Sequence, residues 1–97
     1  MDEARLREDA DAHGQATVAG DLKTAGGYLA KEAFGAAGEV MEKMPKPLEA
    51  CEVGSVETEG DEALVQIRYS GGGDEMVIES RWADRDGSPK IVGLRVL

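Results

Sequence analysis

The C-terminal stretch Asp74–Leu97, DEMVIESRWADRDGSPKIVGLRVL, decides the fold because apolar and polar residues alternate in it on both sides of one turn. A period of two is typical of antiparallel strands that bury one face. Asp86–Gly87, with Pro89 just beyond, supplies the turn of a β-hairpin. The row expected to be buried consists of Met76, Ile78, Ser80 and Trp82, followed by Val92, Leu94 and Val96. We expect the rest of the chain to cover this row, with Trp82 as a core anchor.

Two further strands are expected before the hairpin. Residues 48–58 form an irregular strand in which Gly54 marks a bulge. After a turn at Gly60–Asp61, residues 63–69 alternate regularly. Gly71–Gly73 then leads into the hairpin, so the pattern predicts a four-stranded antiparallel meander over about residues 48–97.

Residues 2–44 are expected to form three helices. Residues 2–19 carry one stripe at spacings of three and four: Leu6, Ala10, His13 and Thr17. Gly20–Asp21 ends this helix and caps a second one, from Leu22 to about Lys31, whose Gly26–Gly27 weakens it. A third helical pattern ends at Pro45–Lys46–Pro47. The fold class is therefore α+β, a single domain over 1–97 with N-terminal helices packed on one face of a curved four-stranded antiparallel sheet.

The composition excludes several classes of function. Twenty acidic against eleven basic residues give a net charge of -9, and a surface of that sign repels phosphate backbones, so we expect no nucleic-acid partner. Cys51 is the only cysteine, which excludes an intrachain disulfide and a cysteine-rich zinc site. The charged start Met1–Arg5 does not resemble a signal peptide, and no apolar run approaches the ~20 residues of a membrane helix. We therefore expect a cytoplasmic protein without a membrane partner.

The sequence resembles the nuclear transport factor two-like superfamily, to which ketosteroid isomerase and the polyketide cyclases also belong. The resemblance rests on the helix junction Gly20–Leu22, on Gly60–Asp61 with the strand after it, and above all on Arg81–Trp82, Asp86–Gly87 and Lys90–Gly93. It implies a cone of helices around a curved sheet. The family's usual early β-hairpin between the helices is hard to find in this sequence.

No pattern indicates a catalytic residue, a metal site or a cofactor. His13 is the only histidine; a helical pair with Asp9, four residues earlier, is conceivable, but a surface or packing role is preferred. Gly71–Gly73 precedes a strand and lacks a following Lys-Ser/Thr, so we interpret it as a turn and not as a phosphate loop. Cys51 has no base that the sequence places near it, which favours an inert strand residue.

The face of the sheet opposite the helices, here called the outer face, is expected to carry charged and apolar residues together. The interface residues that we predict there are Leu64, Val77, Ile91, Arg68, Arg81 and Arg95, with Gln66 and Glu79 beside them. Three interpretations are open: a solvated face with cross-strand ion pairs, an interface with a second subunit, and an anion-binding arginine stripe. The aliphatic residues favour a homodimer joined through the sheet.

The function itself is not identified by the sequence. A pocket that takes a small apolar ligand is expected between the helices and the sheet, with the ligand-binding residues Tyr28, Phe34, Met41, Tyr69 and Trp82. We interpret the chain as a small non-catalytic domain for protein association or weak small-ligand binding. The alternative is a small-molecule enzyme of the isomerase or cyclase type, which the resemblance permits. The absence of a carboxylate from the expected core argues against that alternative.

Overall fold

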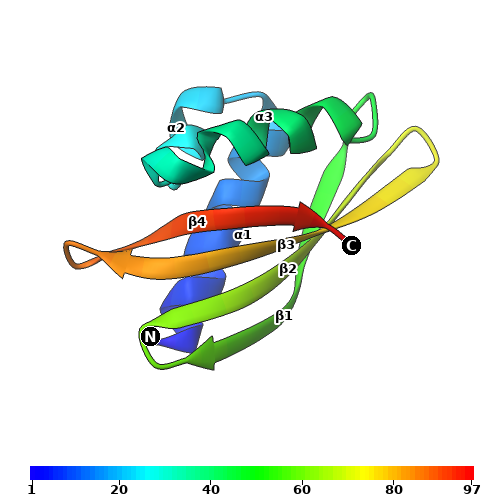
Figure 1. Ribbon diagram of the computed structural model, residues 1–97. Helices are drawn as coiled ribbons and strands as arrows, with labels where there is room; N and C mark the ends of the chain where they lie inside the picture. Colours follow the sequence, from blue (N-terminus) through cyan, green and yellow to red (C-terminus); the bar gives the residue numbers. More distant parts are fainter.

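The computed structural model describes residues 1–97 and consists of a helical layer on one face of a curved antiparallel sheet (Figure 1). The helices are α1 (Glu3–Ala19), α2 (Leu22–Gly26), the 3-10 turn η1 (Lys31–Ala33) and α3 (Phe34–Lys43). The strands are β1 (Ala50–Glu59), β2 (Glu62–Gly71), β3 (Asp74–Arg85) and β4 (Ser88–Val96). They pair in the order β1-β2-β3-β4, all antiparallel, so the predicted fold class is confirmed.

Helix α1 covers the β1 side of the sheet. The Asp2 side chain caps it by accepting a 3.0 Å hydrogen bond from the backbone N–H of Ala4, and Gly20 ends it with φ at 77°. The predicted stripe is buried along its whole length. Where α1 crosses β1, a Cβ on Gly14 would lie 2.8 Å from Cys51 Sγ, so glycine allows the close approach.

Helix α2 is shorter than expected. The prediction of a helix reaching about Lys31 is wrong, because α2 ends at Gly26 after five residues. The chain then runs extended and pairs with β4: Ile91 donates its N–H to the Tyr28 carbonyl at 2.7 Å, and its carbonyl accepts from Ala30 at 2.8 Å. The two glycines that weaken the helix therefore release a segment that is held by the sheet edge instead.

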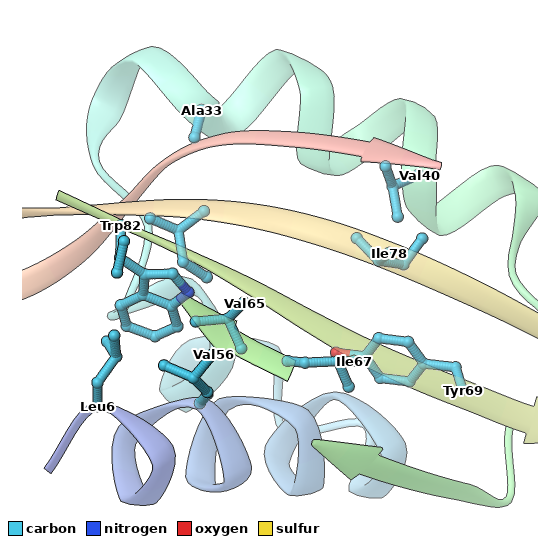
Figure 2. Packing of buried hydrophobic residues seen from close by; sticks show 12 residues of the cluster. Leu6, Ala33, Val40, Val56, Val65, Ile67, Tyr69, Ile78 and Trp82 are labelled. Carbon is cyan, nitrogen blue, oxygen red and sulfur yellow. The ribbon is translucent and has the colours of Figure 1, made fainter. Parts of the chain in front are cut away.

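The core lies between α1 and the inner face of the sheet. Trp82 is fully buried there, and Figure 2 shows its ring directed toward Leu6 of α1. The indole N–H donates to Ser80 Oγ at 2.9 Å, and that hydroxyl donates to the Val65 carbonyl at 3.2 Å. In the predicted row, Ile78, Ser80 and Trp82 are buried and their polar atoms are satisfied. Met76, Val92 and Leu94 are only half-buried and Val96 is exposed, so that part of the prediction is wrong.

A bulge in the last hairpin changes the face of the sheet to which some side chains of β4 point. Arg81 is opposite Gly93, but Trp82 is opposite Ile91, so Val92 has no direct partner on β3. The extra residue turns Ile91 to the inner face, where it is fully buried. The predicted position of Ile91 on the outer face is therefore wrong, because strict alternation was carried through a bulge.

The connection from α3 to β1 packs tightly against the β2–β3 turn. A Cβ on Gly71 would overlap the Pro47 carbonyl oxygen, so no other residue fits at this position without backbone movement. The neighbouring Gly72 N–H donates to the Glu49 carboxylate at 2.7 Å. The residues predicted as a turn thus also fix the end of the helical layer.

None of the helices is both long and apolar enough to cross a membrane.

Candidate functional site

A cavity of about 300 Å³ lies between the helical layer and the inner face of the sheet. Eleven of its fifteen lining residues are hydrophobic. Helix α3 forms one wall with Phe34, Ala37, Gly38, Val40 and Met41; α2 and the segment after it contribute Leu22, Ala25, Gly26 and Leu29; Met44, Ile78 and Leu94 complete the apolar surface. Leu22 and Phe34 are 60% and 54% exposed, so they mark the mouth of the cavity between α2 and α3.

His13 of α1 is one of three polar side chains in this cavity. Its Nδ1 lies 3.0 Å from the Ala25 carbonyl oxygen, and a carbonyl can only accept, so the neutral ring carries its proton on Nδ1. Nε2 makes no hydrogen bond, whereas every fully buried side-chain nitrogen or oxygen has a partner, so Nε2 is not fully buried. His13 therefore lines the cavity with one acceptor left free.

The neutral form of His13 is favoured by its surroundings. Burial lowers the pKa of the imidazole below its usual value, and this outweighs the Ala25 carbonyl, which raises it. The rings of Tyr28 and Trp82 stand edge-on to His13, with centroids at 5.9 Å and 6.3 Å. At neutral pH, His13 is thus an uncharged hydrogen-bond acceptor held in an aromatic frame.

Thr17 and Tyr69 are the other polar residues of the cavity. The Thr17 hydroxyl, one helical turn beyond His13, donates to the His13 carbonyl at 2.9 Å. The Tyr69 ring lies along the inner face of the sheet, with its hydroxyl turned back toward the middle of the core (Figure 2). Burial raises the pKa of Tyr69 to about 12, although a hydrogen bond with Thr17 opposes the shift. Both hydroxyls are therefore protonated at neutral pH.

The structure brings some of the predicted ligand-binding residues together and separates others. Phe34, Met41 and Tyr69 line the cavity. Tyr28 and Trp82 do not line it; they stack against each other and against His13, with their own centroids 6.1 Å apart. Trp82 is fully buried in the core, so it does not contact a ligand in the cavity.

His13 and Thr17 are the polar cavity residues that the sequence analysis did not predict as ligand contacts. The i, i+4 spacing on the buried stripe of the first helix was the available signal, because it places both side chains on the face toward the sheet. The conceivable pair with Asp9 does not form, since the only ion pair of Asp9 is with Arg5 at 3.9 Å and the only hydrogen bond of the His13 ring is to Ala25.

Charged side chains are absent from the cavity. None of its lining residues is Asp, Glu, Lys or Arg. No group of three His, Cys, Asp or Glu side chains is placed to hold a metal ion. Cys51 is half-buried against α1, and burial raises the pKa of its thiol, which keeps it protonated. The cavity can therefore offer hydrogen bonds and apolar contact, but no fixed charge.

The outer face of the sheet is tied by ion pairs within the chain. Arg68 donates to Glu52 at 2.8 Å, and Arg95 donates to Glu79 at 2.8 Å. Arg81 forms no ion pair and is exposed. Leu64 is 38% exposed, and Val77 is half-buried. Leu64, Val77, Arg68, Arg81 and Arg95 thus share this face, whereas Ile91 lies on the other side.

Two solved structures have the same architecture. One is an NTF-2 like protein of unknown function from Burkholderia xenovorans LB400, with a TM-score of 0.64 and 22% identity over 98% of this chain and 83% of that one. The other is a protein from Kribbella flavida DSM 17836, with a TM-score of 0.61 and 19% identity over 94% of this chain and 84% of that one. No protein-family model and no curated protein matches the sequence. The chain therefore has the NTF-2-like fold, which accords with the resemblance seen in its sequence.

Proposed function

Because the chain has the NTF-2-like fold, with an apolar cavity between its helices and its sheet, we propose that it is a small non-catalytic domain that binds a mainly apolar ligand in that cavity. The observation that carries the proposal is the cavity wall. Eleven of its fifteen residues are hydrophobic, Tyr69 among them, and His13, Thr17 and Tyr69 add polar atoms to it. Ligand pockets commonly combine an apolar lining with a few placed polar groups in this way.

The size of the cavity sets the size of the ligand. A cavity of about 300 Å³ is at the lower end of ligand pockets, which span about 300 to 1,000 Å³, so the ligand is small. A ligand of that size has limited contact area, and binding in the micromolar to millimolar range is expected. The domain is thus suited to weak small-ligand binding.

The test is a titration of the ¹⁵N-labelled protein with naphthalene, followed by heteronuclear NMR. We expect shifts confined to residues around the cavity, such as Ala25, Val40 and Leu94. Gly38→Leu should weaken binding about tenfold, because Gly38 borders the cavity. Gly35→Leu is the matched control, since a Cβ at either glycine of α3 meets nothing within 4 Å and only Gly38 lines the cavity. Shifts on the outer face alone, or equal effects of the two variants, would contradict the proposal.

An isomerase or cyclase is the alternative function, and one observation favours it. His13, whose Nε2 is a free acceptor, and Tyr69, whose hydroxyl can donate, both line the apolar cavity, and a general base and a hydrogen-bond donor are the groups that such an enzyme uses. No carboxylate or cation lines the cavity to stabilise a developing charge, which favours binding over catalysis. Deuterium exchange from D₂O into a bound cyclic ketone, lost in His13→Phe, would reverse the preference.

Association of two copies through the outer face is a further proposal. Exposed Leu64, half-buried Val77 and unpaired Arg81 support it, because a purely solvated face needs no aliphatic residues. The ion pairs that Arg68 and Arg95 form within the chain remove two of the expected contacts to a partner. Light scattering at micromolar concentration tests the proposal. A dimer that Val77→Asp dissociates would support it, and a wild-type mass of one chain would exclude it.

A further inference from the structure

Two polar groups of the cavity have their protons engaged within the chain. Nδ1–H of His13 is donated to the Ala25 carbonyl at 3.0 Å, and the Thr17 hydroxyl is donated to the His13 carbonyl at 2.9 Å. The Tyr69 hydroxyl, which is protonated at neutral pH, can still donate or accept.

His13 leaves one acceptor without a partner in the chain. Its Nε2 has a lone pair and no proton, because the ring proton lies on Nδ1. A ligand whose polar group only accepts, such as a ketone or an ether, would leave Nε2 unpaired. The ligand must therefore bring a donor.

The charge of the site narrows the kind of donor. No Lys or Arg lines the cavity to hold an anion, and no Asp or Glu lines it to hold an ammonium group. A charged ligand would be buried without a counter-ion, at a high cost in desolvation. A neutral O–H is the donor that satisfies Nε2 at the lowest cost.

We propose that the ligand of this cavity is a neutral alcohol or phenol, whose hydroxyl donates to Nε2 of His13 while its apolar body lies against α3. This inference rests on the proposed binding function and adds the chemical class of the ligand. It also assigns His13 as the residue that selects that class.

The experiment compares four naphthalene compounds in NMR titrations of the intact chain at pH 7.5. They are 2-naphthol, 2-methoxynaphthalene, naphthalene and 2-naphthoate. We expect 2-naphthol to bind about tenfold more tightly than 2-methoxynaphthalene, which differs only in the missing donor. Equal affinities, or tightest binding of the naphthoate anion, would overturn the inference. If naphthalene still binds in the cavity, the proposed function stands without it; if none of the four binds, both fail.

The variant His13→Phe removes the acceptor and keeps an aromatic ring between Tyr28 and Trp82. It should lose the preference for 2-naphthol over 2-methoxynaphthalene. If this variant does not fold, a long-range ¹H–¹⁵N spectrum of the wild-type protein decides instead, because protonated and bare imidazole nitrogens resonate apart. A bare Nε2 whose resonance moves with 2-naphthol and not with 2-methoxynaphthalene supports the inference. A proton on Nε2 in the free protein would overturn it.

Discussion

The helices α1 and α3 cover the same sheet in different ways. Helix α1 has six buried residues, among them Leu6 and Ala10 with no exposure, and it comes close enough to β1 to require Gly14. Helix α3 has one buried residue, Val40, while Phe34 and Met41 are 54% and 37% exposed. The difference places the core under α1 and the cavity under α3, so one half of the helical layer stabilises the fold and the other half is free to bind.

Polar contacts of the segments before α3 tie this side of the helical layer to the sheet. At its start, Arg85 of β3 makes a bidentate ion pair with Glu32, at 2.9 Å and 3.0 Å. Lys90 donates to the Gly27 carbonyl at 2.6 Å. Exposed pairs of this kind contribute little to stability because solvent screens them, whereas a buried Leu contributes about 2 kcal/mol. These contacts therefore position the wall of the cavity without filling it.

The strongest test of this comparison is Trp82→Ala, which removes the anchor on the α1 side. We expect a loss of about 3 to 5 kcal/mol in the free energy of unfolding, because the ring is fully buried and its N–H is hydrogen-bonded. Urea denaturation followed by circular dichroism measures the change. A loss under about 1 kcal/mol would place the indole outside the core.

A paired truncation compares the two helices directly. Leu6→Ala on α1 should cost about 2 to 5 kcal/mol, because the side chain is fully enclosed. Met41→Ala on α3 should cost less than about 1 kcal/mol, because its side chain lies at an open cavity mouth and is partly in water already. Urea melts of both variants under one set of conditions are sufficient. Equal losses would show that α3 packs as firmly as α1.

The pH dependence of stability separates the buried histidine from the surface carboxylates. The pKa of His13 is lowered in the folded protein, so the unfolded chain takes up its proton first as the pH falls. The contribution of His13 to the free energy of unfolding is fully present above about pH 6.5. It should decline below that pH, by at most about 1.4 kcal/mol per pH unit. Urea melts between pH 7.5 and 5.5 measure this, because most carboxylates titrate lower. His13→Phe should flatten the decline; a flat wild-type curve would contradict the burial of a neutral ring.

The smallest expected effect comes from one substitution made on each helix. Gly38→Ala on α3 should raise the free energy of unfolding by about 1 kcal/mol, since helix propensity improves and the added Cβ meets nothing within 4 Å. Gly14→Ala on α1 would put a Cβ 2.8 Å from Cys51 Sγ, so it should be less stable than Gly38→Ala by at least about 1 kcal/mol. Thermal melts of the two variants compare them, and equal stabilities would mean that α1 is as loosely packed as α3.

The fold was predictable from local patterns wherever those patterns are regular. The alternation in β2 and β3 places Val65, Ile67, Ile78 and Trp82 inside, as found. The failures occur where one residue interrupts the period. The extra Val92 reverses Ile91, and Gly26–Gly27 ends α2 in favour of pairing with β4. Both outcomes depend on tertiary contacts, which the alternation of apolar and polar residues does not reveal.

The cavity was only partly predictable for a related reason. Apolar residues such as Phe34 and Trp82 look alike in the sequence, yet one is at the mouth of the cavity and the other fills the core. Which of them meets a ligand depends on how closely each helix approaches the sheet. His13 was visible as part of a buried stripe, but the freedom of its Nε2 follows from the position of the Ala25 carbonyl, which no spacing reveals.

The short pairing of residues 28–30 with β4 also bears on how this protein avoids aggregation. An open sheet ends in strands with unpaired backbone groups, which recruit strands from other molecules. At one edge, the N–H and carbonyl of Ile91 are already used by Tyr28 and Ala30. At the other edge, β1 is interrupted by an irregularity between Val53 and Val56 and carries several glutamates. The chain itself therefore covers the β4 edge around Ile91, and shape and charge make the β1 edge a poor template.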